Sequence, residues 1–93
     1  MPQFPGDMSA FIEKNLRYPA ALLEDGVEGK VLIRFIVRKD GSTDSIRVLR
    51  PCHPLFDAEA KRVIAIMPCW TPGKRSGKPV DVFFVLPITF KLD

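Results

Sequence analysis

Histidine and cysteine are scarce in this chain of 93 residues, which holds one histidine, His53, and two cysteines, Cys52 and Cys69. These three candidate ligands have neither a Cys-x-x-Cys pair nor a helical spacing, so they do not form a recognisable zinc motif. Cys52 and His53 are adjacent, but the sequence offers no third group that would orient them for nucleophilic catalysis. We therefore expect no enzyme activity, no metal site and no cofactor, and we interpret both cysteines as half-buried free thiols.

Long apolar runs are absent as well, and so is a strong excess of charge of one sign. No stretch is long and apolar enough to predict a membrane-spanning helix, and no signal peptide is recognisable. The formal net charge is +3, and the 14 lysines and arginines are spread along the chain, which does not indicate a nucleic-acid-binding protein. The length suits one small domain, so we expect residues 1–93 to fold as a single unit.

The clearest pattern in the chain is its last stretch, residues 80–92. Its even positions are all apolar and its odd positions are mixed, which predicts a long β-strand with one buried face. Pro87 lies inside this stretch and has no N–H to donate, so the strand is expected at a sheet edge with the Pro87 nitrogen facing outward. The backbone N–H groups of Phe83, Val85 and Thr89 would then face the same open edge.

Phe83 and Val85 are the informative pair on that edge, because they lie on the face opposite the predicted helices. An exposed apolar strip beside an open edge suits an extended peptide, whose main chain would be added to the sheet as a further strand. The alternative is that the N-terminal arm, residues 1–6, covers the strip through Phe4.

Three helical segments can be predicted from caps and apolar spacing. Asp7 is an N-cap signal, and apolar residues then recur at helical spacing, which predicts a helix over residues 7–16. Pro19 predicts the start of a short second helix that runs to residue 23. Asp57 is interpreted as the N-cap of a further helix that Pro68 ends. Its apolar stripe consists of Phe56, Ala60, Val63, Ile64 and Met67.

A hairpin and a crossover define the predicted topology. Residues 30–38 and 43–50 alternate around the turn signal Asp40-Gly41, which predicts two antiparallel strands. Residues 69–79 are rich in proline and glycine and are expected to form a loop, with Trp70 as a core residue. A right-handed crossover through the helix then gives the strand order second, first, third. The predicted fold class is α+β: a three-stranded antiparallel/mixed sheet of order 2-1-3 with two helices packed on one face.

Several segments resemble one protein family. They are MPQFPGD at residues 1–7, NLRYPAALLEDGVEGKVLIRFIVRKDGS at 15–42, FDAEAKRVI at 56–64, MPCWTPGKRSGKPV at 67–80 and PITF at 87–90. Together they resemble the TonB C-terminal domain family, specifically its Bacteroidota-type form. The resemblance implies the same sheet-and-helix fold that the residue patterns predict.

The resemblance also implies a set of partner-binding residues. In the family, the edge of the last strand captures a short receptor segment, the TonB box, and a Gln-Pro-x-Tyr-Pro segment touches the receptor plug. The second segment aligns with residues 15–19, where Tyr18 and Pro19 match and Asn15 and Leu16 differ. The implied partner-binding residues are therefore Phe83, Val85, Pro87, Thr89, Tyr18, Pro19 and Asn15.

The function implied by the resemblance is that of a periplasmic energy-transducing adaptor. It would bind outer-membrane TonB-dependent receptors and couple the inner-membrane proton motive force to nutrient import. We expect the chain to be the C-terminal domain of a longer protein that is anchored in the inner membrane and engages ExbB/ExbD-type motor proteins. A homodimer of the isolated domain is possible through its open edge. The alternative is a TonB-like interaction module of a membrane sensor or signalling protein.

Overall fold

The computed structural model describes residues 2–92, which contain three helices and five strands. In chain order these are α1 (Met8–Asn15), α2 (Ala20–Glu24), β1 (Gly29–Val37), β2 (Thr43–Arg50), α3 (Pro54–Ala65), β3 (Gly73–Arg75), β4 (Lys78–Val80) and β5 (Val82–Phe90). Within these residues no helix is long and apolar enough to cross a membrane.

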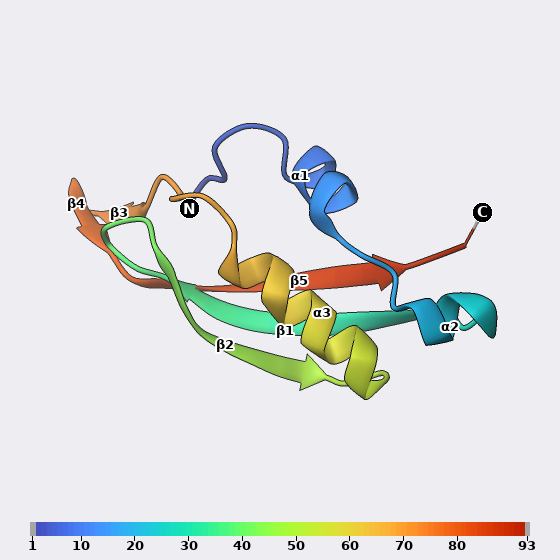
Figure 1. Ribbon diagram of the computed structural model, residues 1–93. Helices are drawn as coiled ribbons and strands as arrows, with labels where there is room; N and C mark the ends of the chain where they lie inside the picture. The colour runs from blue at the N-terminus through green and yellow to red at the C-terminus, as the bar shows by residue number, and fades with distance from the viewer. Residues whose placement is uncertain (1, 93) are drawn as a thin grey trace.

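The main sheet has the strand order β2-β1-β5, and both neighbouring pairs are antiparallel. The predicted α+β fold and its order 2-1-3 are therefore confirmed. Figure 1 shows β5 running along one side of β1, with β2 on the other. The central strand β1 alternates fully buried and partly exposed residues, because one of its faces lies under the helices and the other does not.

The β1–β2 turn forms as the Asp40-Gly41 signal predicts. One carboxylate oxygen of Asp40 accepts hydrogen bonds from the Ser42 backbone N–H (2.9 Å) and hydroxyl (2.7 Å). Gly41 has a φ of 90°, which side chains disfavour. Its carbonyl also accepts a hydrogen bond from the backbone N–H of Trp70 (2.7 Å). The turn is thereby tied to the segment that follows α3.

The third helix begins earlier than the sequence indicated, and the assignment of Asp57 as its N-cap is wrong. The cap is His53, whose Nδ1 accepts a hydrogen bond from the backbone N–H of Leu55 (3.1 Å). Pro54 follows as the first helical residue, where a missing N–H costs nothing. Asp57 lies in the first turn and accepts a hydrogen bond from the Cys52 backbone N–H (3.1 Å). The predicted apolar stripe of this helix is buried as expected.

Two boundaries near the C-terminus also differ from the prediction. The expected loop over residues 69–79 contains the short antiparallel pair β3–β4, whose turn holds Ser76 and Gly77 at positive φ. The last strand covers Val82–Phe90 rather than residues 80–92. Asp81 interrupts it, because its carboxylate turns to the Lys39 backbone N–H (2.8 Å) and to Arg38 (3.2 Å).

The core is built on aromatic side chains at the helix-covered face of the sheet. Phe56 of α3 stacks on Phe90 of β5, with ring centroids 4.2 Å apart. Trp70 is 3% exposed and packs against Phe35 and Phe84 at centroid distances of 5.6 and 5.1 Å. Trp70 is therefore a core residue, as predicted. Helix α1 has no fully buried residue, and its apolar side chains pack against this core from outside.

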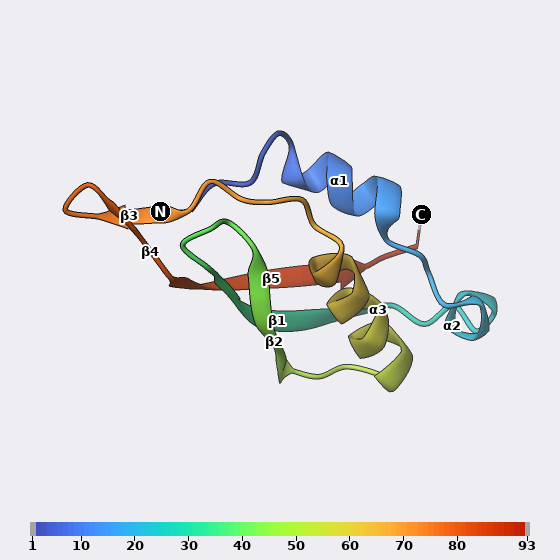
Figure 2. The ribbon, with the colours of Figure 1, turned by 60° about the vertical axis from the view of Figure 1, so that its left-hand side comes forward.

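The molecule is elongated, with extents of 50 × 24 × 16 Å. Figure 2 shows the β3–β4 hairpin projecting beyond the sheet at one end and α2 lying at the other. The long edge of β5 runs between these two ends.

Candidate functional site

The pairing register fixes which backbone groups of β5 face outward. Pro87 is paired with Leu32 of β1, and facing residues of an antiparallel pair alternate between hydrogen-bonded and non-hydrogen-bonded positions. Because Pro87 has no N–H, its position is of the second kind. Leu86 and Ile88 therefore bond to β1, and the odd-numbered residues of β5 point their N–H and C=O groups away from it. Among residues 2–92 no further strand of the sheet covers that side.

The side chains along this edge are exposed. Phe83 is 61% exposed and Val85 is 48% exposed, and Pro87 and Thr89 are exposed too. Phe4 of the N-terminal arm does not cover them, because its ring packs instead against Phe11 and Trp70, at centroid distances of 5.4 and 5.5 Å. Phe83 is contacted by Arg34, whose guanidinium carbon lies 4.9 Å from the ring centroid.

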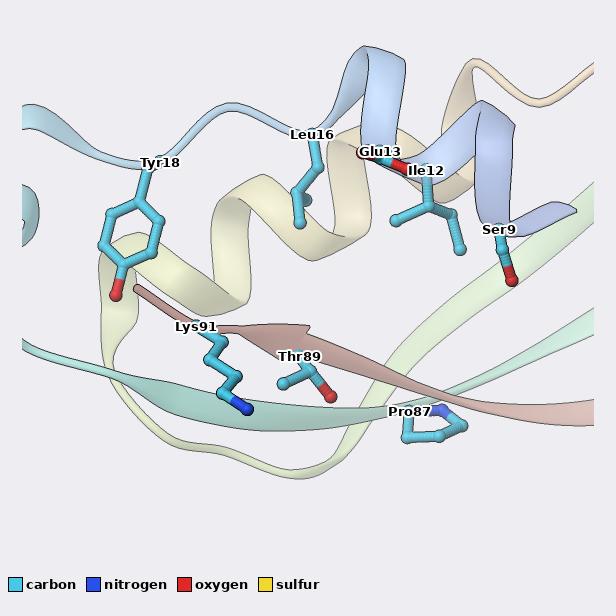
Figure 3. A pocket seen from close by; sticks show the side chains of 8 residues that line it. All are labelled: Ser9, Ile12, Glu13, Leu16, Tyr18, Pro87, Thr89 and Lys91. Atoms are coloured by element: carbon cyan, nitrogen blue, oxygen red, sulfur yellow. The ribbon is translucent and has the colours of Figure 1, made fainter. Parts of the chain in front are cut away.

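A groove of about 430 Å³ lies between α1 and the C-terminal half of β5. In Figure 3 the side chains of Ile12 and Leu16 point from α1 toward the strand, where Pro87 and Thr89 form the opposite wall. The complete lining is Ser9, Ile12, Glu13, Leu16, Tyr18, Pro87, Thr89 and Lys91. A strand that pairs with the β5 edge would run beside this groove and could place one apolar side chain in it.

Tyr18 closes one end of the groove and is held by the core. Its hydroxyl donates a hydrogen bond to the Val27 carbonyl, and its ring meets Phe56 and Phe90 edge-on, with centroids 5.5 and 5.8 Å away. Burial raises the pKa of the Tyr18 phenol, and the nearby carboxylate of Glu28 raises it further. Tyr18 is therefore a rigid, neutral wall of the groove.

Two hydrogen bonds to an ion pair within α3 join the segment between α1 and α2 to that helix. Glu59 accepts hydrogen bonds from Arg62 (2.7 Å) and from the backbone N–H of Arg17 (2.6 Å), and Arg62 also donates to the Asn15 carbonyl (2.7 Å). The Arg62 guanidinium holds the pKa of Glu59 below its usual range. This network fixes the position of Tyr18 relative to the edge strand.

The seven residues named from the sequence do not form one cluster. Tyr18, Pro87 and Thr89 meet in the groove, whereas Phe83 and Val85 lie farther along the same edge. Asn15 and Pro19 serve the local structure: the Asn15 amide caps α1 through the Phe11 carbonyl (2.9 Å), and Pro19 is the N-cap residue of α2.

Sequence reasoning missed the helix side of the groove. Ile12 and Leu16 are spaced four residues apart on α1, which correctly predicts one helical face. Both side chains pack against the core but remain half-exposed. The spacing alone could not reveal that the helix stands away from the strand.

The cysteines contribute nothing to this site. Cys52 and Cys69 are free, as predicted, but both are exposed rather than half-buried. Within residues 2–92 no group of histidine, cysteine or carboxylate side chains could hold a metal ion.

Comparison with known proteins agrees with the fold. A family model described as Gram-negative bacterial TonB protein C-terminal matches residues 14–92. No curated protein matches the chain.

Three solved structures are similar over most of their length. The solution structure of Pseudomonas aeruginosa TonB CTD is 29% identical, with a TM-score of 0.69, and the alignment covers 83% of this chain and 78% of that one. A solution structure of Helicobacter pylori TonB-CTD is 26% identical, with a TM-score of 0.69 and coverage of 91% and 77%. A second one from the same organism is 26% identical, with a TM-score of 0.65 and coverage of 90% and 88%.

Proposed function

The chain belongs to the Gram-negative bacterial TonB protein C-terminal family, and on that premise we propose that the β5 edge binds the TonB box of an outer-membrane TonB-dependent receptor. The family is periplasmic, non-enzymatic and made of protein-interaction adaptors, and its members interact with TonB-dependent receptors. The chain is therefore a TonB-like adaptor domain. The receptor segment would be captured as a strand added beside β5.

The observation that supports this proposal is the outward-facing row of backbone groups at Phe83, Val85 and Thr89. An added strand would bond its main chain to this row. On one of its faces the strand's side chains would contact Phe83 and Val85, and on the other they would enter the groove beside Ile12 and Leu16.

A force that pulls along the added strand would act on several backbone hydrogen bonds at the same time. Such a strand pair therefore resists separation and suits the transmission of force. In our proposal the force originates at ExbB/ExbD-type motor proteins, which draw on the inner-membrane proton motive force. They would be engaged through a membrane-anchored region outside residues 1–93. The result of the pull would be nutrient import through the receptor.

The test is an NMR titration of the domain with TonB-box peptides from receptors of the same genome. We expect shifts concentrated on residues 83–89 and around Ile12 and Leu16. Val85→Pro removes an outward N–H and should abolish these shifts while the domain stays folded. Val85→Thr keeps that N–H and is the matched control, so it should still bind.

Three results would contradict the proposal. Binding that survives in a folded Val85→Pro variant would show that the edge ladder is not used. A folded domain that binds none of the peptides would favour the sensor or signalling module. Edge-to-edge homodimers in place of peptide binding would show that β5 pairs with its own copy.

A further inference from the structure

The sheet face opposite the helices carries four basic side chains. Val31, Ile33 and Phe35 of β1 are fully buried under the helices, so the residues that alternate with them face the other side. Cross-strand partners share a face, which places Arg47 and Arg50 of β2 beside Arg34 and Leu32 of β1. We call Lys30, Arg34, Arg47 and Arg50 the open-face cations.

These cations have no anionic partner within residues 2–92. The ion pairs found there join Arg38 to Asp44 and Asp81, and Arg62 to Glu59. No carboxylate of the described chain therefore neutralises the open-face cations directly.

Two of the open-face cations, Arg34 and Arg47, face each other although their like charges repel. Arg34 and Arg47 lie directly opposite each other across the β1–β2 pair, and like charges at facing positions destabilise a sheet. The Arg34 guanidinium stacks over Phe83, which holds it on the face. An anion between the two arginines would turn this repulsion into two charge-assisted hydrogen bonds.

The other two cations flank a hollow. Lys30 and Arg50 line a depression of about 260 Å³ together with Leu32 and Pro87. The lining of the hollow therefore combines two basic side chains with two apolar ones. A glutamate or aspartate beside an aliphatic side chain matches both features.

We propose that this open face binds an acidic, extended segment of a protein partner. Its carboxylates would contact the open-face cations, and its apolar side chains would rest on Leu32 and Pro87. The segment would be continuous with whatever occupies the β5 edge, because Pro87 lines both the hollow and the groove. The inference goes beyond the edge-strand function and does not require it.

Two other occupants fit less well. A second copy of this chain would bring four cations against four. A lipid surface would need a cluster of protruding apolar side chains, whereas the exposed Phe83 and Val85 of this face lie along the β5 edge, and the Arg34 guanidinium lies over the Phe83 ring.

The experiment compares two double variants that lose the same charge. Arg34→Gln/Arg47→Gln removes the opposed pair, and Lys74→Gln/Arg75→Gln removes two exposed cations from the β3–β4 hairpin as the matched control. The probe is an acetylated and amidated Glu-Glu-Leu-Leu-Glu-Glu peptide, which presents both carboxylates and a leucine on each face when extended, and Gln-Gln-Leu-Leu-Gln-Gln is its neutral counterpart. Binding is followed by NMR at low salt, with the arginine side-chain signals included.

We expect the acidic peptide to shift Arg34, Arg47 and Arg50 in the wild type. The Arg34→Gln/Arg47→Gln variant should bind it about tenfold more weakly, while the hairpin variant stays within about twofold of the wild type. The neutral peptide should leave the arginine signals unchanged.

Equal weakening in both double variants would overturn the proposal, because the effect would then be one of net charge alone. So would unchanged binding in Arg34→Gln/Arg47→Gln. Binding to vesicles containing phosphatidylglycerol without binding to the acidic peptide would assign the face to a lipid surface instead.

Discussion

Pro87 of β5 lies directly opposite Leu32 of β1, at a position where the ladder needs no N–H. The proline therefore costs the sheet no internal hydrogen bond, and its missing donor falls on the open edge. Natural proteins often place proline on an edge strand to prevent uncontrolled pairing with strands of other molecules. In this chain the edge is only partly blocked, since the neighbouring odd-numbered residues of β5 keep their N–H groups.

Replacing Pro87 should increase pairing between the β5 edges of two molecules. Pro87→Val adds one outward N–H and a good strand former, so we expect dimers to form at lower protein concentration than in the wild type, as measured by sedimentation velocity. Thr89→Val changes an exposed side chain without adding a donor and should behave like the wild type. A Pro87→Val protein that stays monomeric at every concentration would argue against an edge that is available for pairing.

Trp70 offers a test of the aromatic core. Its indole N–H is buried without an acceptor in the described structure, although the ring is well packed. Trp70→Phe removes the unpaired donor along with some volume, so the two effects should largely cancel, within about 1 kcal/mol. Trp70→Ala should lower the free energy of unfolding by about 3–5 kcal/mol. Urea unfolding followed by circular dichroism measures both, and equal losses in the two variants would contradict this account.

The β1–β2 turn should be sensitive to a single methyl group. Gly41→Ala places a Cβ against the Trp70 carbonyl oxygen and at a φ of 90°. Backbone strain and steric overlap should therefore both lower the stability of the fold. Gly77→Ala has a φ of 77° but open space around the added atom, and it should cost only the conformational penalty, about 1–2 kcal/mol. Thermal unfolding of the two variants would decide the point, because similar midpoints would mean that the close approach to Trp70 is unimportant.

Acid should weaken the hydrogen-bonded network that joins α3 to the segment between α1 and α2. The pKa of Glu59 is lowered in the folded state, so its contribution to stability is complete above the usual glutamate pKa of about 4.3. That contribution is lost as the pH falls through the lowered, folded-state value. Asp40 and Asp44 also have lowered pKa values and add to the loss.

Glu59→Gln isolates the contribution of the ion pair. The variant should be less stable than the wild type at pH 7, because it leaves Arg62 without its carboxylate. The difference between the two proteins should be smaller at pH 3 than at pH 7, because the wild-type carboxylate is progressively protonated as the pH falls through its lowered pKa. Urea unfolding at the two pH values measures this, and a constant difference would show that the charge of Glu59 is not what matters.

Much of the fold could be predicted because local signals and topology agreed. The hairpin around Asp40-Gly41 placed two strands side by side, and the edge position that Pro87 required was the one that a right-handed crossover produces. Where two signals competed, the wrong one was chosen. Asp57 is the commoner cap residue, but His53 followed by Pro54 forms the cap in the structure.

The remainder depended on tertiary contacts that no local pattern carries. The β3–β4 hairpin is three residues long on each side, and its turn signal, Ser76-Gly77, was hidden among basic and proline residues. The groove exists because α1 packs through Phe11 onto Phe4 and leaves Ile12 and Leu16 facing the strand. The sequence predicted that α1 has one apolar face, but it did not predict how far α1 lies from β5.

The most direct test of the central claim is amide hydrogen exchange of β5, measured with and without a bound TonB-box peptide. We predict that, in the free domain, the N–H groups of Leu86 and Ile88 are protected and those of Phe83, Val85 and Thr89 exchange rapidly. The peptide should then protect Phe83, Val85 and Thr89 selectively. Protection of these three in the free monomer, or no gain of protection when the peptide is bound, would contradict the assignment of β5 as an open, strand-accepting edge.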